Sequence, residues 1–227
     1  DPAGFNIDVC REVRGALPTT PVFLQGSVVD WGQAEWALGD GVCDAVEMTR
    51  AQIADPDLVS KLSADAAHTI RPCIRCNQTC QVRDARSPVV TCVGEPTSGR
   101  ETEDPDWYAH TARARNVLVV GGGIAGLEAA RVAAVRGHRV RLVERTHQLG
   151  GIAALAGPGA PLVQWLIGGC TAAGVAVEMG TERVAPRPDD VAIQCTGGRP
   201  GTRPYEVAPG APVLAVVDVH RGTPLPD

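Results

Sequence analysis

The sequence predicts an α/β protein with parallel strands, and three observations indicate that class. Short apolar strands alternate with helical segments over the first 62 residues, an order that produces parallel pairing. An aperiodic segment rich in cysteine follows. A further apolar strand then runs into the glycine-rich turn Gly121–Gly126 and a helix, which is the start of a βαβ unit. We therefore expect two α/β parts joined by a cysteine-bearing loop.

The N-terminal part is divided into elements by its proline, glycine and aspartate residues. The signals predict helices over residues 5–17, 30–38 and 56–62 and strands over residues 21–26 and 44–50. Asp30 and Asp55 are the expected N-caps, and Pro56 occupies the favoured first helical position. The first helix has apolar side chains four residues apart, which predict one apolar face formed by Phe5, Val9, Val13 and Leu17.

The C-terminal part begins with the βαβ pattern at Asn116. We expect a helix over residues 124–136 and strands over residues 117–120, 138–144, 175–179, 191–195 and 213–219. The last three strands carry weaker signals than the first two. Alternation of strand and helix again predicts parallel pairing.

Composition argues against several classes of function. The 227 residues carry a net charge of −5, which gives no electrostatic reason to expect nucleic acid or an anionic membrane as a partner. The longest apolar stretch, residues 117–135, is interrupted by Glu128 and Arg131 and predicts no transmembrane span. Eight cysteines are too unevenly spread along this chain for a secreted disulfide scaffold, so we expect a reducing, cytoplasmic location.

Four of the cysteines form a compact pattern in a segment, residues 71–107, without helix or strand periodicity. Cys73, Cys76, Cys80 and Cys92 stand as C-x2-C-x3-C-x11-C. The short spacings let one loop supply three thiolates and a longer excursion return the fourth, as an iron–sulfur cubane requires. A zinc site with four thiolate ligands tolerates similar spacings, and a disulfide pair is a third interpretation. The neighbouring glycine motif favours the cluster. The other cysteines are predicted to be small core residues: Cys10, Cys43, Cys170 and Cys195.

The glycine motif matches G-x-G-x-x-G. Gly121 permits the tight turn, Gly123 lets a pyrophosphate approach the backbone, and Gly126 lets the helix pack on the strand. The helix starts at Ile124 and Ala125, where free N–H groups face the phosphates. The alternative is a glycine-rich turn without a ligand.

An acidic residue follows the glycine motif at the sequence spacing typical of a ribose-binding carboxylate. Glu144 ends the next predicted strand, 18 residues after Gly126, where a carboxylate binds a 2′-hydroxyl. That acid disfavours a 2′-phosphate, so FAD, ADP or NAD fits better than NADP. Arg145 and Gly151 complete the predicted site, although the pair Gly150–Gly151 is also compatible with a plain turn.

These motifs together resemble one family. The run Ile-Arg-Pro-Cys-Ile-Arg-Cys-Asn-Gln-Thr-Cys at 70–80, then Cys92, Gly-Arg-Glu at 99–101 and the glycine loop, resembles the iron–sulfur members of the old yellow enzyme family, such as 2,4-dienoyl-CoA reductase and trimethylamine dehydrogenase. In that family an FMN-binding TIM barrel precedes a [4Fe-4S] loop and FAD- or ADP-binding and NAD(P)H-type domains. The resemblance implies three segments: residues 1–66 as the last two strand–helix units of the barrel, 67–115 as the cluster loop and linker, and 116–227 as an incomplete FAD/NAD(P)-type domain.

The resemblance also implies an FMN site at the end of the barrel segment. Arg50 would hold the FMN phosphate, helped by the backbone near Gly26, Ser27 and Thr49. The family usually has arginine at the position of Ser27, so this chain departs from the pattern there. The alternative for Arg50 is a solvated charge that precedes a helix.

The function that the resemblance implies is electron transfer within a flavin-dependent oxidoreductase. Electrons would pass between a dinucleotide-site flavin, the [4Fe-4S] cluster and FMN, with conjugated enoyl compounds or methylated amines as substrates and NAD(P)H as one possible donor. An amine dehydrogenase would hold ADP at the second site and pass electrons to an electron-transfer flavoprotein. The alternatives are a non-catalytic electron-transfer subunit that docks on a separate catalytic barrel chain and a zinc-stabilised nucleotide-binding module.

The expected TIM barrel is incomplete in this chain. A TIM barrel needs eight strands and about 250 residues, whereas two barrel strands are predicted here. The remaining barrel strands and the nicotinamide domain are therefore expected from a longer chain or from partner subunits. No catalytic residue is assigned from the sequence.

Overall fold

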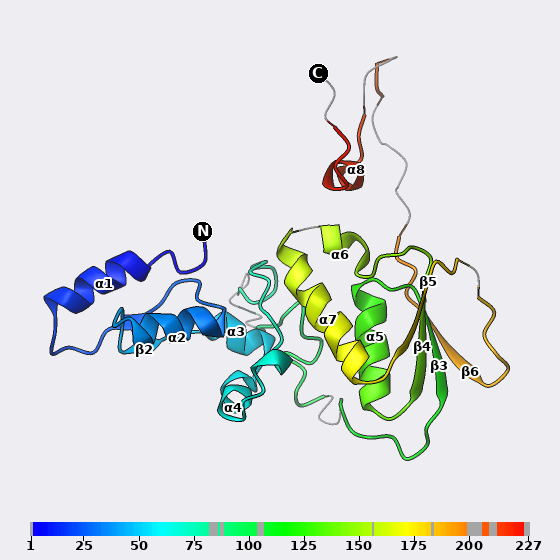
Figure 1. Cartoon of the computed structure of the whole chain (residues 1–227), viewed down its shortest axis with the longest axis horizontal. Coiled ribbons are helices and arrows are strands. Elements are labelled where there is room, and N and C mark those ends of the chain that lie inside the picture. The colour runs from blue at the N-terminus through cyan, green and yellow to red at the C-terminus, as the bar shows by residue number, and fades with distance from the viewer. Residues whose placement is uncertain are drawn as a thin grey trace. The chain divides into compact units, whose positions relative to one another are not determined.

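The computed structural model describes residues 2–81, 86, 89–103, 107–155, 157–182, 184–198, 206–208 and 213–224 (Figure 1). The chain divides into two compact units, Asp1–Trp107 and Tyr108–Asp227. Both units contain parallel strands connected by helices, which confirms the predicted α/β class.

The N-terminal unit has short strands between longer helices. Its elements are α1 (Ile7–Ala16), β1 (Phe23–Leu24), α2 (Trp31–Gly39), β2 (Ala45–Val46), α3 (Thr49–Ala54), α4 (Leu58–Ser63) and the 3-10 turn η1 (Ala67–Thr69). Strands β1 and β2 pair in parallel, as predicted, with Leu24 opposite Val46. The core of this unit is formed by Cys10, Leu24, Val28, Ala34, Ala37, Val42 and Cys43.

The predicted aspartate caps and the predicted second strand are only partly confirmed by the structure. Asp30 caps α2 as predicted, because its carboxylate accepts a hydrogen bond from the N–H of Gln33 at 2.9 Å. The predicted strand over residues 44–50 is wrong after Val46, since Thr49 already begins α3. That segment, Thr-Arg-Ala-Gln-Ile-Ala, contains good helix formers, and its two alanines are buried. The prediction that Asp55 is the N-cap of the next helix is wrong, because α4 begins at Leu58 and its N-cap is Asp57. The Asp55 carboxylate instead accepts from the N–H of Asp57 at 3.1 Å.

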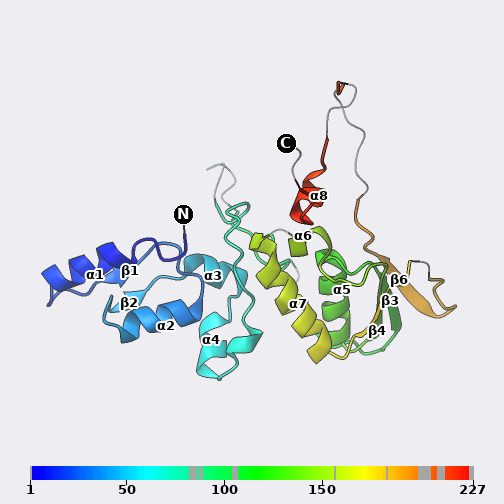
Figure 2. The ribbon, with the colours of Figure 1, turned by 45° about the horizontal axis from the view of Figure 1, so that its top comes forward.

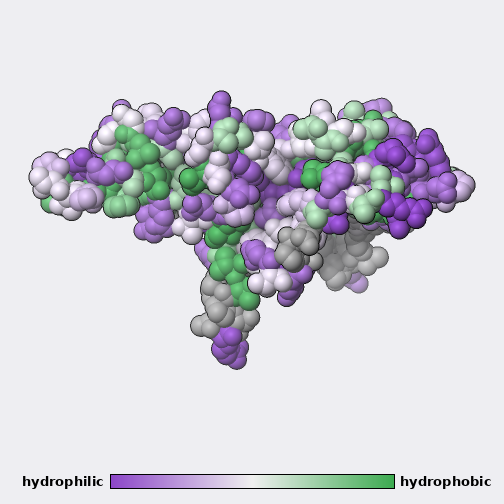
Figure 3. Space-filling view, turned by 90° about the horizontal axis from the view of Figure 1, so that it is seen from below, coloured by the Kyte–Doolittle hydropathy of each residue, from purple (hydrophilic) through white to green (hydrophobic). Residues whose placement is uncertain are grey.

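Helix α1 forms where the periodicity predicts it, but its predicted apolar face is not buried. Phe5, Val9, Val13 and Leu17 are 44%, 58%, 40% and 48% exposed, whereas Cys10 faces the core. Periodicity identifies an apolar face without saying which partner covers it. Figure 3 shows a patch of hydrophobic surface on one face of the N-terminal unit.

The C-terminal unit is a four-stranded parallel sheet with the order β5-β4-β3-β6. Its elements are β3 (Asn116–Val120), α5 (Ile124–Val135), β4 (Arg139–Glu144), α6 (Gly151–Leu155), the 3-10 turn η2 (Gly157–Gly159), α7 (Ala160–Ala172), β5 (Ala176–Met179), β6 (Asp190–Gln194) and α8 (Val216–His220). Helices α5 and α7 lie side by side on one face of the sheet (Figure 2). Leu118 and Leu142 from the strands and Leu127 and Leu166 from these helices are almost completely buried. This arrangement is the predicted Rossmann-like fold.

The predicted strand over residues 213–219 is wrong. The described residues there include α8, whose turn is closed by hydrogen bonds from Asp218 and Val219 to the carbonyl of Ala215. A short apolar run alone does not distinguish a strand from a helix, so periodicity failed at this position. Among the helices of the described ranges, none combines the length and the hydrophobicity that a membrane crossing requires.

Candidate cofactor sites

The glycine loop lies between β3 and α5, and glycine is present at its three motif positions for different structural reasons. Gly121 has a φ of 106°, and a Cβ at this residue would overlap the carbonyl of Cys195. A Cβ at Gly126 would overlap the carbonyl oxygen of Gly121. Around Gly123, in contrast, no heavy atom lies within 4 Å of the Cβ position. Packing therefore requires glycine at positions 121 and 126. At position 123, glycine leaves the backbone accessible to a ligand.

The N-terminus of α5 adds hydrogen-bond donors to this loop. The helix begins at Ile124, followed by Ala125, and the first N–H groups of a helix have no intrahelical partner. They favour a bound anion such as a pyrophosphate.

Glu144 ends β4 and is tied directly to the glycine loop. One carboxylate oxygen accepts from the N–H of Gly122 at 2.7 Å, and the other accepts from the N–H and hydroxyl of Thr146, both at 2.9 Å. Partial burial by itself would raise the pKa of Glu144, but these hydrogen bonds and the charge of exposed Arg145 lower it below its usual value. The carboxylate is thus ionised beside the loop and retains lone pairs for a ribose hydroxyl.

The Gly150–Gly151 pair packs against the same loop. Gly150 donates to the carbonyl of Gly122 at 2.7 Å and forms an isolated parallel bridge with Gly123. Both residues of the pair have positive φ, 97° and 56°. The structure thus brings Gly151 and Glu144 to the predicted nucleotide loop from two further segments of the chain.

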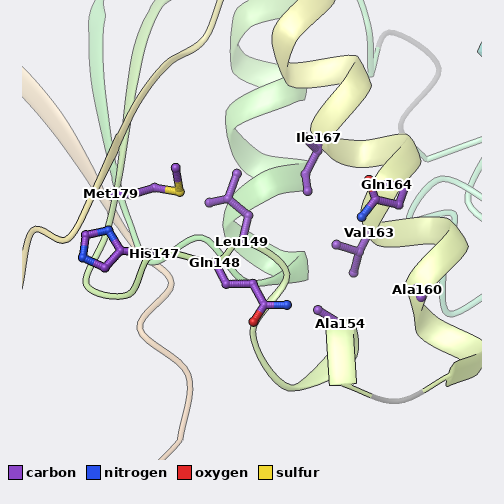
Figure 4. A pocket seen from close by; sticks show the side chains of 9 residues that line it. All are labelled: His147, Gln148, Leu149, Ala154, Ala160, Val163, Gln164, Ile167 and Met179. Carbon is purple, nitrogen blue, oxygen red and sulfur yellow. The ribbon is translucent and has the colours of Figure 1, made fainter. Parts of the chain in front are cut away.

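A pocket between the segment after β4 and helix α7 was not predicted. It encloses about 600 Å³ of space, including its open mouth. Figure 4 shows His147 and Met179 at one end and Val163 of α7 at the other, with Leu149 between them. Its lining comes from several separate segments, so no local sequence signal could have identified it.

The four clustered cysteines line one pocket, which we call the cysteine pocket; Arg50, Ile53 and Asn77 also line it. Two of its sulfurs accept backbone hydrogen bonds at 3.4 Å, from Arg75 to Cys73 and from Gly94 to Cys92. Burial raises the pKa of the Cys73 thiol, and the N–H of Arg75 and the charge of Arg50 oppose that rise. In the described ranges, no three His, Cys, Asp or Glu side chains have the closeness of a formed metal site. Four soft donors on one pocket nevertheless suit an iron–sulfur cluster or zinc.

Each cysteine is a free thiol in the structure, and those outside the pattern differ in burial. Cys10, Cys43 and Cys170 are buried, as expected of small core residues. Cys195 is only partly buried and lies against the glycine loop.

A buried ion pair joins the two ends of the cysteine loop, and sequence reasoning missed it. Arg71 and Glu95 are 4% and 6% exposed, and their side chains lie 2.8 Å apart. Arg71 also donates to the carbonyl of Gly94, and Glu95 accepts from the N–H and hydroxyl of Thr97. A signal for the pair was present: opposite charges stand just before Cys73 and just after Cys92.

The residues assigned to FMN phosphate line a second pocket in the N-terminal unit, the Ser27 pocket. Gly26, Ser27, Thr49 and Arg50 all border it, together with Phe5, Gln25, Val28 and Glu47. The Arg50 guanidinium donates to the hydroxyl of Ser27 at 2.5 Å. The Glu47 carboxylate, which accepts from the Thr49 hydroxyl at 2.5 Å, opposes an anion there. Arg50 is the one cationic side chain among the described residues that line this pocket.

Comparison with known proteins gives consistent matches. A family model described as FAD dependent oxidoreductase matches residues 116–183. A metal reductase of Desulforamulus reducens is 36% identical over 206 residues, covering 83% of this chain and 30% of that protein. A probable N-methylproline demethylase of Rhizobium meliloti is 34% identical over 207 residues, covering 87% of this chain and 30% of that protein. The solved structure of a 2-naphthoyl-CoA reductase matches with a TM-score of 0.86 at 28% identity, covering 98% of this chain and 35% of that one. The chain spans about a third of the length of these proteins.

Alanine at two positions of the glycine loop separates packing from binding. Gly126→Ala forces a Cβ onto the Gly121 carbonyl and should destabilise the unit by about 1–3 kcal/mol, measured by denaturant unfolding. Gly123→Ala has room and should leave unfolding unchanged while weakening nucleotide binding, measured by calorimetry. Equal stability of the two variants would contradict this division of roles.

Glu144 should make the stability of the C-terminal unit depend on pH. Its pKa is lowered in the folded state, so its contribution is present above the unfolded value near 4.5 and is lost as the pH falls through the folded value. Glu144→Gln should lower the melting temperature at neutral pH, and the difference from wild type should shrink on acidification below pH 4.5. Glu182→Gln, at an exposed acid of the same unit, is the control. A difference that grows at low pH would refute the assignment.

Glu95→Gln should open the cysteine loop. The change removes the charge of Glu95 from buried Arg71, and a buried pair that loses one member costs about 3–5 kcal/mol. Chemical denaturation should show this loss, and bound metal should transfer faster to a chelator. Glu103→Gln makes the same change at an exposed acid and should do neither.

Proposed function

Because the chain belongs to the old yellow enzyme family of flavin-dependent oxidoreductases, we propose that it supplies the electron-transferring part of an enzyme acting on conjugated enoyl compounds or methylated amines. The observation that carries this proposal is the position of Arg50. It lines both the cysteine pocket and the Ser27 pocket, so that a cluster and a flavin phosphate would be neighbours.

In this proposal Cys73, Cys76, Cys80 and Cys92 hold a [4Fe-4S] cluster. When bound, the cluster supplies one-electron transfer, which divides two-electron flavin chemistry into single steps between FMN and the second flavin. The N–H groups of Arg75 and Gly94 stabilise charge on two of the thiolates.

The two nucleotide sites have separate groups of residues. Arg50 binds the FMN phosphate with help from the backbone at Gly26, Ser27 and Thr49. Gly121, Gly123, Gly126 and the first N–H groups of α5 bind the pyrophosphate of FAD or ADP, Glu144 binds a ribose hydroxyl, and Arg145 and Gly151 border the site. NAD(P)H is the proposed donor in a reductase, whereas an amine dehydrogenase would pass electrons to an electron-transfer flavoprotein.

The division into a barrel segment (1–66), a cluster loop with linker (67–115) and a dinucleotide domain (116–227) is part of the same proposal. The missing barrel strands and nicotinamide domain complete it, either in one longer chain or as partner subunits, in the cytoplasm. The exposed apolar face of α1 favours a second form of the proposal, in which this chain is an electron-transfer subunit docked on a separate catalytic barrel chain.

Anaerobic purification of the complete protein, with iron, sulfide, zinc and flavin analysis on one sample, tests the proposal. We expect about four irons and four sulfides per chain, together with bound flavin. A second flavin indicates FAD at the glycine loop. Zinc without iron or flavin would refute electron transfer and leave a zinc-stabilised nucleotide-binding module. A separate chain in equal amount would support the docked subunit.

A further inference from the structure

Two residues with unusual backbone conformations each accept a hydrogen bond from the side chain of Arg50. Ser27 and Asn77 have φ values of 55° and 51°, in the left-handed region that non-glycine residues seldom adopt. The side chain of each accepts a hydrogen bond from Arg50 at 2.5 Å, Ser27 from Nη2 and Asn77 from Nη1. Backbone conformations of this kind persist where the surrounding structure requires them, and they gather at functional sites.

The two partners belong to different pockets. Ser27 lines the Ser27 pocket, and Asn77, which lies between Cys76 and Cys80, lines the cysteine pocket. Arg50 lines both, and it is the one cation among the described residues that border the Ser27 pocket. The guanidinium is a rigid planar fork, so a displacement of one Nη atom also displaces the other. An anion that draws Arg50 toward Ser27 therefore acts on Asn77 as well.

We propose that Arg50 couples the flavin-phosphate site to the cysteine loop, with Asn77 as the positioning residue that acts through it. The inference rests on the proposed FMN site and goes beyond it, because it assigns a role in phosphate binding to a residue outside the Ser27 pocket. Coupling between two binding sites is reciprocal. Phosphate binding therefore steadies the cysteine loop, and an intact cysteine loop strengthens phosphate binding.

The test uses the complete protein, purified anaerobically with its iron and then stripped of FMN. Asn77→Gly removes the acceptor for Nη1 and keeps a backbone that tolerates positive φ, so it avoids new strain. Gln78→Ala changes the neighbouring exposed amide, which borders neither pocket. Titrations with FMN and with riboflavin, which lacks the phosphate, isolate the phosphate contribution.

We expect Asn77→Gly to weaken FMN binding about fivefold, a typical coupling between sites, and to leave riboflavin binding unchanged. Gln78→Ala should bind FMN within about twofold of wild type, well below that coupling. Equal FMN affinity of Asn77→Gly and wild type, with iron intact in both, would overturn the coupling and leave the FMN site standing. Riboflavin binding to wild type as tightly as FMN would overturn the phosphate role of Arg50 and the coupling together.

A second readout involves neither affinity nor enzyme activity. FMN should slow the transfer of iron from wild type to a chelator, and this protection should be absent in Asn77→Gly. If that variant does not retain iron, Ser27→Gly provides the same test from the other pocket. It should speed iron transfer although Ser27 does not line the cysteine pocket, and an unchanged rate would overturn the proposal.

Discussion

The N-terminal unit depends on the buried ion pair between Arg71 and Glu95. An isolated charge at this depth would be strongly unfavourable, and each member is stabilised by the other member and by hydrogen bonds with the surrounding chain. The pair joins the two ends of a loop whose first and last thiols would otherwise be separated by a long, aperiodic stretch. Buried Asp55 extends the network, because it accepts from the N–H of Arg71 at 2.7 Å and from Lys61 at 2.6 Å. The loop is thereby anchored to the helices that also place Arg50.

In the C-terminal unit, close contacts between backbone segments hold the candidate site together, whereas in the N-terminal unit a buried ion pair does so. Gly121 and Gly126 let β3, α5 and the end of β6 meet without side chains between them, and Glu144 is fixed by backbone N–H groups of the same loop. A motif built on backbone geometry can be identified from sequence, because only glycine satisfies it. This explains why the glycine loop and its helix formed where the sequence predicts them.

The parts that sequence could not predict have a common physical cause. Arg71 and Glu95 are 24 positions apart, and Arg50 and Asn77 are 27 apart, so only the fold makes them neighbours. Helix α8 replaced a predicted strand, and α3 begins within the predicted end of another, because short segments are compatible with both states until tertiary contacts select one. The sequence pattern identified the apolar face of α1, but no described part of the chain buries it.

That face has a thermodynamic consequence. Four apolar side chains in water lower the stability of the N-terminal unit relative to a state in which they are covered. Any surface that binds the folded unit and not the unfolded chain adds stability by mass action. The cluster loop and the Arg50 network would then gain rigidity from whatever covers α1. In the proposed enzyme, assembly and retention of the cluster would therefore be linked equilibria.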